Sequence, residues 1–407
     1  MLFSTAITII TVMMLAWLLS PTMRENPQWQ ATVTPLASIV GSGFLIIAPL
    51  LYQIAGVFSV LVMLLIVLLA SGLGRVMRHN IQHVEPMLRR RPAKSVLGLE
   101  RISDLSLLFA YLISVAFYLS LLSAFVLRLW PSAAAWSEGQ DMITTALLVF
   151  IGVQGFRGGL GALEHLEEYS VSIKLAIIVA LLFALGSYFV QSPLSTISWQ
   201  WPQGDWWYRI RLIAGTLLVI QGFETSRYLG QAYEWDMRCR SMRSAQRIAA
   251  GIYLLFVVLM VPLLYGNGGV AVEETAIIDL AVQVASILGP LLLLAAIMSQ
   301  FSAAVADTLG AGGLAGELIP GRGRGRERYR YLVFTAAAVV LVWLSDVFEL
   351  ISLASRAFAL YYLVQCLLAL RVMQAREQQR SLAYWATVAL ALVMGFVVLF
   401  ALPVESL

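Results

Sequence analysis

The sequence predicts an all-α membrane protein with about 12 transmembrane helices, ten of which form a 5+5 inverted-repeat core. Three observations support this fold class. The composition is too apolar for a soluble chain, basic loops alternate along the sequence, and two apolar runs carry glycine-containing interruptions at matching positions. In the predicted core, the first and sixth helices are discontinuous.

Composition places the chain in a membrane. Of its 407 residues, 60% are hydrophobic and 12% are charged, whereas a soluble protein carries about 25% charged residues. The apolar runs do not alternate polar and apolar residues, as the strands of a membrane barrel would. The net charge of +4 is ordinary for a membrane protein with basic loops, so no nucleic-acid partner is expected.

The chain is treated as one transmembrane domain, 1–407. Residues 35–190 and 191–372 are the expected repeats, and 1–34 and 373–407 each add a peripheral helix. A span needs ~20 apolar residues. The predicted spans are 2–20, 35–56, 57–75, 105–130, 142–158, 169–190, 209–230, 247–266, 279–308, 330–345, 350–372 and 381–402.

Arginine and lysine give the orientation. The segment 75–101 is basic, as are the segments near 240, 325 and 375, whereas 131–141, 191–206 and 267–278 contain no Lys or Arg. Cytoplasmic loops are enriched in these residues. We therefore expect an integral protein of a bacterial inner membrane with both termini outside.

The interruptions are Gly41-Ser42-Gly43 within 35–56 and Gln221-Gly222-Phe223-Glu224 within 209–230. An unpaired backbone amide in hydrocarbon costs several kcal/mol, so a broken span is tolerated only beside protein or a cavity. Gly41 and Gly222 are 222 − 41 = 181 positions apart. The fifth and tenth predicted core helices are separated by the same offset. Because each half has an odd number of helices, the second half must be inverted.

Three stretches resemble the amino acid–polyamine–organocation (APC) superfamily with the LeuT fold. Ala37–Gly43 is similar to its first broken helix, Gly222–Glu224 to the second, and Leu294–Ser302 to the eighth core helix. Solute:sodium symporters and amino acid permeases look closest, although Gln300 stands where several symporters have a second hydroxyl. The resemblance implies a transporter and a ligand site at the bilayer midplane.

Unwound carbonyls suit a cation, and half-helix N-termini suit an anionic group. Tyr111 and Tyr118, at i and i+7, are placed to flank a substrate, although such aromatics also simply pack. Close helix packing is likewise an alternative role for Gly41 and Gly43. The candidate substrate-binding residues are Val40, Gly41, Ser42, Gly43, Gln221, Gly222, Phe223, Glu224, Tyr111 and Tyr118.

A coupling-ion site is expected on the eighth core helix. Ser299 and Ser302 share a helix face, and with Ala296 and carbonyls of the first break they would offer oxygen ligands suited to Na⁺. Membrane serines also often bond their own helix backbone. The resemblance points to Lys174 as a proton-exchanging substitute for sodium, and snorkelling to the interface is its alternative role. No other cofactor is expected.

Four ionisable residues are candidates for a gate or a structural ion pair, since intramembrane charges usually pair. Glu224 and Arg227 lie at i and i+3, which favours a pair between them. Asp307 is a candidate to line the inner exit path or to pair with a basic residue such as Arg356, which is itself a candidate gate, and a structural pair is favoured over a substrate role. Glu224 is also a candidate to bind a cationic group or a coupling proton.

The sequence thus favours a secondary active transporter that moves a small polar solute, an amino acid or amine, coupled to sodium or protons. A transporter-like sensor, a channel and a metal-ion transporter of the same fold are the alternatives. Catalytic motifs such as HExxH are missing, so no enzyme is predicted. His79, His83 and His165 fall in predicted loops. The solute, the coupling ion, symport versus antiport and the oligomeric state stay open.

Overall fold

The structure is a computed structural model. It describes residues 2–41, 43–88, 93–129, 138–158, 161–193, 195, 197–201, 204–217, 221–230, 232–268, 275–318 and 324–403. Within these ranges the side chains of 158, 161–168, 313, 316–318 and 324–328 are outside the description.

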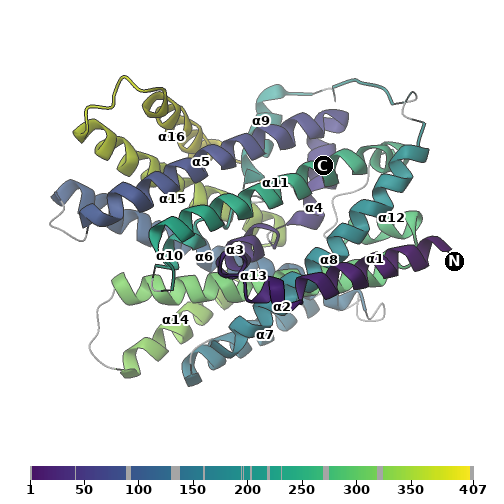
Figure 1. The fold of residues 1–407 in the computed structure, drawn as a ribbon, viewed down its shortest axis with the longest axis horizontal. Helices are drawn as coiled ribbons and strands as arrows, with labels where there is room; N and C mark the ends of the chain where they lie inside the picture. Colours follow the sequence, from purple (N-terminus) through teal and green to yellow (C-terminus); the bar gives the residue numbers. More distant parts are fainter. Residues whose placement is uncertain are drawn as a thin grey trace.

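The described residues form an all-helical fold (Figure 1). The α-helices are α1 (Leu2–Leu18), α2 (Pro21–Arg24), α3 (Pro27–Ile39), α4 (Phe44–Ala55), α5 (Ser59–Leu88), α6 (Lys94–Leu127), α7 (Gly139–Gly158), α8 (Gly161–Gln191), α9 (Trp206–Gly215), α10 (Thr225–Tyr228), α11 (Trp235–Gly266), α12 (Ala276–Val284), α13 (Leu288–Leu318), α14 (Arg324–Val342), α15 (Val347–Ala375) and α16 (Leu382–Phe400).

Seven helical stretches of the described chain are long and apolar enough to cross a membrane, and shorter apolar helices accompany them. The count of 12 spans stays a prediction. Two boundaries were wrong. The segment 75–101 is mostly helix, because α5 runs on to Leu88 and carries His79 and His83 with it. The run at 279–308 is divided because Ala285 is extended between α12 and α13.

The first interruption separates α3 from α4. Helix α3 ends at Ile39 and α4 begins at Phe44, with Gly43 at φ 111°. A left-handed backbone costs an L-residue roughly 1–2 kcal/mol, and glycine avoids that cost. Gly41 lies against α13, where an added Cβ would stand 2.5 Å from the Ala303 Cβ. Close packing, the alternative role of Gly41, therefore applies in this structure.

The second interruption lies between α9 and α10. Helix α9 ends at Gly215, and Gly222, which follows the undescribed residues 218–220, has φ 116°. Helix α10 is a single turn, so the second half of this broken helix is much shorter than α4. Each interruption contains a left-handed glycine, Gly43 in the first and Gly222 in the second.

The long helices pack around these breaks. Helix α6 packs chiefly against α13 and α15, α13 also packs against α8, and α5 runs beside α11 (Figure 1). Helix α3 packs against α11, and α10 contacts both α3 and α13. Helix α1 lies along α8, and α16 lies along α15. The two broken helices are thus enclosed by helices from both halves of the chain.

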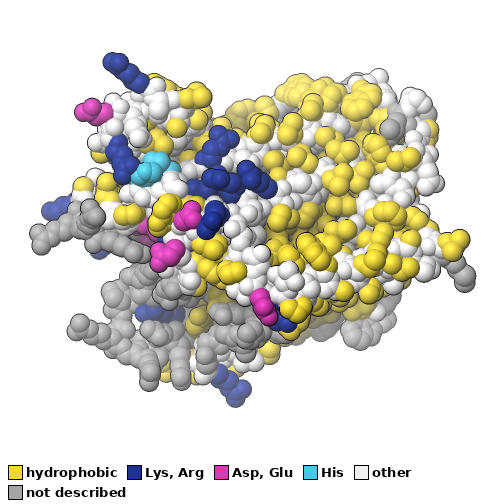
Figure 2. All heavy atoms as spheres, viewed as in Figure 1, with side chains coloured by type: hydrophobic (Ala, Val, Ile, Leu, Met, Phe, Trp, Pro, Cys, Tyr) yellow, Lys and Arg dark blue, Asp and Glu magenta, His cyan; other side chains and the backbone are white. Residues whose placement is uncertain are grey.

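Basic side chains gather at one end of the molecule. In the view of Figure 2, Lys and Arg lie over the left-hand end, and the right-hand part of this face is mainly hydrophobic. The end of α5 and the start of α11 meet at that end. The positive-inside rule predicts that it is cytoplasmic.

Replacing Gly222 with alanine should destabilise the protein more than replacing Gly268, which also has a positive φ but lies in open space. Both substitutions put a side chain at positive φ, at a cost of roughly 1–2 kcal/mol. At Gly222 the new Cβ would in addition stand 2.5 Å from the Ser38 Oγ and 2.6 Å from the Ile39 nitrogen. Thermal unfolding in detergent measures the effect. Gly251→Ala, in open space on α11, is the control, and an equal loss in all three variants would contradict the prediction.

Candidate functional site

The two breaks lie side by side. The Gly222 backbone approaches Ser38 and Ile39 at the end of α3 so closely that no side chain fits between them. Ser42 lies outside the described residues. The candidates Val40, Gly41, Gly222 and Phe223 therefore lie together at one buried junction, and their role in substrate binding stays a prediction.

Three side chains from three helices bond to the carbonyls freed where α3 ends. The Lys174 Nζ on α8 donates to the Ala37 oxygen at 2.8 Å. The Tyr253 hydroxyl on α11 donates to the Ile39 oxygen at 2.8 Å, and the Ser299 hydroxyl on α13 donates to the Val40 oxygen at 2.9 Å. Last-turn carbonyls have no partner within their own helix, so these donors make the break tolerable in an apolar surrounding.

Lys174 occupies the place expected for a sodium ion. Its side chain is fully buried, so it does not snorkel to the interface. Besides the Ala37 carbonyl, its ammonium contacts the Ser302 hydroxyl at 3.4 Å. Ser302 in turn donates to the Ser299 carbonyl at 3.0 Å, and Ala296 is buried one turn earlier. The Lys174 ammonium thus contacts one carbonyl of the first break and one of the two serine hydroxyls expected to bind sodium.

Glu224 is fully buried and turns back towards its own break. Its Oε2 accepts from the Gly222 amide at 2.8 Å and from the Tyr362 hydroxyl at 2.6 Å. The Phe223 ring stacks on the Tyr362 ring, with centroids 5.3 Å apart and planes 13° apart. The Glu224 Oε1 has no hydrogen-bond partner among the described residues. One carboxylate oxygen is therefore held in place while the other stays available.

Gln221 adds a second polar group that the described residues leave unsatisfied. It is 2% exposed, and neither atom of its amide has a hydrogen-bond partner of normal geometry in the described part of the chain. The hydroxyl of Tyr118 faces this amide from α6. Tyr111 lies beside it, fully buried, in edge contact with Phe358 at 6.0 Å. Both tyrosines are thus at the junction, where they pack and present hydroxyls.

Little space is left beside these groups. A cavity of about 20 Å³ adjoins Gln221, Phe223 and Tyr362, between α5 and α15. That volume holds about one water molecule. The junction is therefore closed in this conformation, and a solute would enter only after helices separate.

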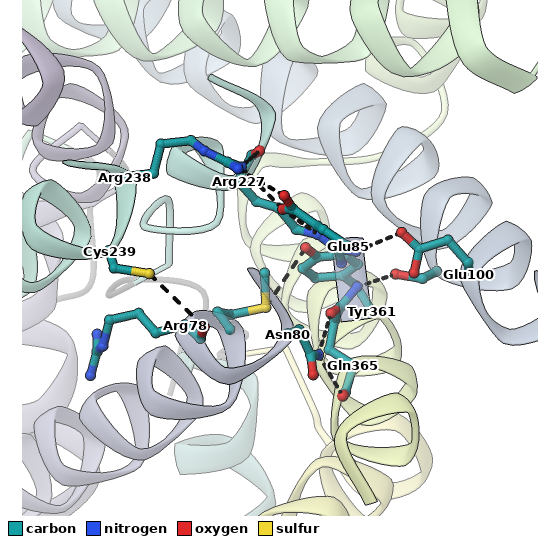
Figure 3. Close-up of polar contacts among 11 residues, drawn as sticks. Arg78, Asn80, Glu85, Glu100, Arg227, Arg238, Cys239, Tyr361 and Gln365 are labelled. Atoms are coloured by element: carbon teal, nitrogen blue, oxygen red, sulfur yellow. Dashed lines mark hydrogen bonds and ion pairs between the residues drawn. The ribbon is translucent and has the colours of Figure 1, made fainter. Parts of the chain in front are cut away.

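Arg227 does not pair with Glu224, so the predicted i, i+3 pair is wrong. Glu224 precedes α10 and its side chain bends back to the Gly222 amide, away from the turn that carries Arg227. Arg227 instead contacts Glu100 at 2.6 Å and Glu85 at 3.7 Å (Figure 3). Neither glutamate was predicted, because both lie within the segment 75–101, which the sequence indicates as a loop.

The predicted pair between Asp307 and Arg356 is also wrong. Asp307 is buried and accepts from the Ser38 hydroxyl at 3.3 Å. Arg356, on α15, donates to the Ala401 carbonyl just after α16. The two side chains serve different interfaces, because α15 presents Arg356 to α16 while Asp307 faces the first break.

Comparison with known proteins identifies the family to which this chain belongs. A family model described as APC superfamily transporter matches residues 21–401. An uncharacterised protein of Aquifex aeolicus (strain VF5) is 42% identical over 398 residues, which cover 97% of this chain and 96% of that protein.

Solved structures give the same picture of the fold. A manganese transporter of Eremococcus coleocola shares 14% identity at a TM-score of 0.53, covering 92% of this chain and 85% of that one. A Na⁺-coupled sialic acid symporter, in a substrate-bound outward-open state, shares 12% identity at a TM-score of 0.53, covering 100% and 98%. At these identities the likeness shows the fold alone.

The described residues form a helical membrane protein with paired broken helices and a fold like that of these solved transporters. The family match is more specific. The chain belongs to the APC superfamily of transporters.

Replacing Gln221 with leucine should leave stability unchanged or raise it. A buried polar group without a partner costs about 1–3 kcal/mol, and leucine removes that cost at similar volume. Gln365→Leu is the matched control, because the Gln365 amide bonds to Ser103 at 2.6 Å and to Asn80 at 2.7 Å. The control should lose stability by about 1–3 kcal/mol. Thermal unfolding of both variants in detergent checks this, and a clear loss in Gln221→Leu would show that its amide is already satisfied.

Proposed function

We propose that the chain is a secondary active transporter that moves a small polar solute, an amino acid or amine, by alternating access. The observation behind this proposal is the junction of the two breaks. There the buried Gln221 amide and the Glu224 Oε1 keep unused hydrogen-bonding capacity. Buried polar atoms are nearly always partnered in a finished structure. A solute that supplies the missing partners would account for them.

The chemistry of these groups favours a solute with an ammonium group. A carboxylate oxygen accepts charge-assisted hydrogen bonds, which are roughly twice as strong as neutral ones. The Gln221 amide offers an NH₂ group with two donor hydrogens and an acceptor oxygen, and it suits a carboxyl or amide group of the same solute. Phe223, Tyr362 and Tyr111 supply aromatic walls around them.

The packing supports an inverted repeat. If α6 corresponds to α13 and α8 to α15, exchanging the two halves converts the α6–α15 contact into the α13–α8 contact, and both are extensive. The corresponding helices α5 and α11, and likewise α7 and α14, pack against each other. A left-handed glycine in each break, Gly43 and Gly222, follows the same correspondence. Alternating access commonly arises when one such repeat or bundle moves against the other.

For the coupling ion, Lys174 favours protons over sodium. Its ammonium already contacts the Ala37 carbonyl and the Ser302 hydroxyl. Two unit charges 4 Å apart repel by about 4 kcal/mol at an effective dielectric constant of 20. Sodium would therefore bind there only after Lys174 moved or lost its proton. A buried lysine that changes its protonation between the two access states supplies the coupling.

The other functions keep weaker support. The manganese transporter shows that this fold can carry a metal ion, but the likeness is one of fold. In the described part of the chain, no group of three or more His, Cys, Asp or Glu is placed to hold a metal ion. A sensor or a channel would share the closed junction. The basic end supports insertion in a bacterial inner membrane with that end inside.

Replacing Lys174 with methionine should uncouple solute movement from protons. Methionine fills similar space without a charge, so solute exchange should persist while solute-driven proton uptake falls at least tenfold. The test uses proteoliposomes that enclose a pH-sensitive dye, with solutes chosen by a thermal-shift screen of amino acids and amines. Thr387→Ala, which removes a buried hydroxyl that bonds its own helix backbone on α16, is the control.

Sodium provides the opposing outcome. Binding that requires sodium in the parent protein, and that is unchanged in Lys174→Met, would rule out coupling through this lysine. Stabilisation by ligands without any flux would favour the sensor, and flux that dissipates gradients without coupling would favour the channel.

A further inference from the structure

Four charged side chains form a closed network between four helices. Arg227 on α10 contacts Glu100 on α6 at 2.6 Å and Glu85 on α5 at 3.7 Å. Arg238 on α11 contacts both oxygens of Glu85, at 2.7 and 3.0 Å. Figure 3 shows the four side chains converging from the separate helices. The side chains are 3–17% exposed, so this network is largely removed from solvent.

The charges within this network balance one another. It contains two arginines and two glutamates, so removal of any one leaves an uncompensated charge among partly desolvated groups. A surface ion pair on the same helix differs in this respect. Asp236 and Arg240 on α11 are 3.0 Å apart, but both side chains are 54% exposed. Exposed pairs contribute little to stability, which makes Asp236 a suitable control position.

The network lies between the junction of the breaks and an open cavity. That cavity has a volume of about 440 Å³, within the range of small-molecule sites. Its lining includes Glu85 and Arg238 together with His83, Tyr233, Glu234 and Trp235. Its lining residues belong to the end of α5, to the start of α11 and to the segment before α11, at the basic end of the molecule (Figure 1).

Helix α10 connects the junction of the breaks to the charged network. Glu224, bonded to Tyr362, immediately precedes its single turn, and Arg227 lies within that turn. Arg238 also donates to the Arg227 carbonyl at 2.6 Å, so α10 is held at both ends. If Glu224 moves when a solute binds, α10 moves with it, and the distances from Arg227 to Glu100 and Glu85 change.

We propose that Glu85, Glu100, Arg227 and Arg238 form the inner gate, and that the adjoining cavity is the mouth through which solute leaves. The gate opens when α10 and α11 separate from α5 and α6, which breaks the Arg227–Glu100 and Arg238–Glu85 contacts. The assignment of these four residues as a gate for solute rests on the proposed transport function. The network itself is defined by the ion pairs and hydrogen bonds described above.

A reporter cysteine at Ser226 tests the gate. Ser226 is fully buried in α10, next to Arg227, and the two native cysteines, Cys239 and Cys366, are replaced by serine in the background variant. A charged, membrane-impermeant thiol reagent is added to sealed vesicles from the side of the basic end. Glu85→Gln and Glu100→Gln should each raise the labelling rate of Ser226→Cys at least threefold. Asp236→Asn should leave the rate unchanged.

A second reporter separates gate opening from general loosening. Cys366, buried in α15, is kept as the only cysteine in a parallel set of the same variants. It should stay unlabelled throughout. Faster labelling of Cys366 in the gate variants, or faster labelling of Ser226→Cys from the opposite side, would overturn the gate.

The labelling needs no solute and no gradient, so it is independent of transport. If the protein transports a solute but the labelling rate of Ser226→Cys is the same with and without the Glu85→Gln and Glu100→Gln substitutions, the gate is overturned and the transport function is not. Labelling that follows the network in a protein without solute flux supports the gate as a conformational element and counts against the transport function alone.

Discussion

The structure depends on how the carbonyls at the end of α3 are satisfied. A helix that ends inside an apolar bundle leaves backbone acceptors without water to bond them. Here Lys174, Tyr253 and Ser299 supply the missing donors. They come from α8, α11 and α13, so the end of α3 is a point at which three long helices are tied together. The break is thus both the least regular part of the fold and the part most connected to the rest.

This arrangement suits a helix bundle that must move. A single hydrogen bond contributes about 1 kcal/mol net. The three contacts therefore position the end of α3, but breaking any one of them costs little free energy. The ion pairs around Arg227 differ, because separating them exposes charges that are largely buried together. Their separation is favourable only where water enters, as it can from the neighbouring cavity. The contacts at the break thus tolerate small shifts of α3. The proposed gate, in contrast, is either closed with its ion pairs formed or open with its charges in water.

Much of the architecture could be predicted from the sequence, because the membrane imposes strong constraints. Glycine and glutamate in the middle of apolar runs violate those constraints, and for this reason the interruptions at Gly43 and Gly222 were found. The partners of Arg227 and Asp307 could not be predicted in the same way. Spacing predicts which residues share a helix face, but Glu224 precedes a single turn and follows the backbone of its own break. Side-chain direction at a break is set by tertiary contacts that no local pattern contains.

Residues were also missed when their surroundings made them look ordinary. Tyr253 lies in an apolar run, and nothing in that run indicates that its hydroxyl bonds to the Ile39 carbonyl. The four-helix charge network was missed because α5 and α6 continue beyond the apolar segments. The structure then shows an asymmetry between the breaks. The first break takes its donors from neighbouring helices, whereas the second keeps the free acceptor of Glu224 and the unsatisfied amide of Gln221. The proposed solute would therefore gain most of its hydrogen bonds at the second break, and Arg227 connects that same break to the charged network.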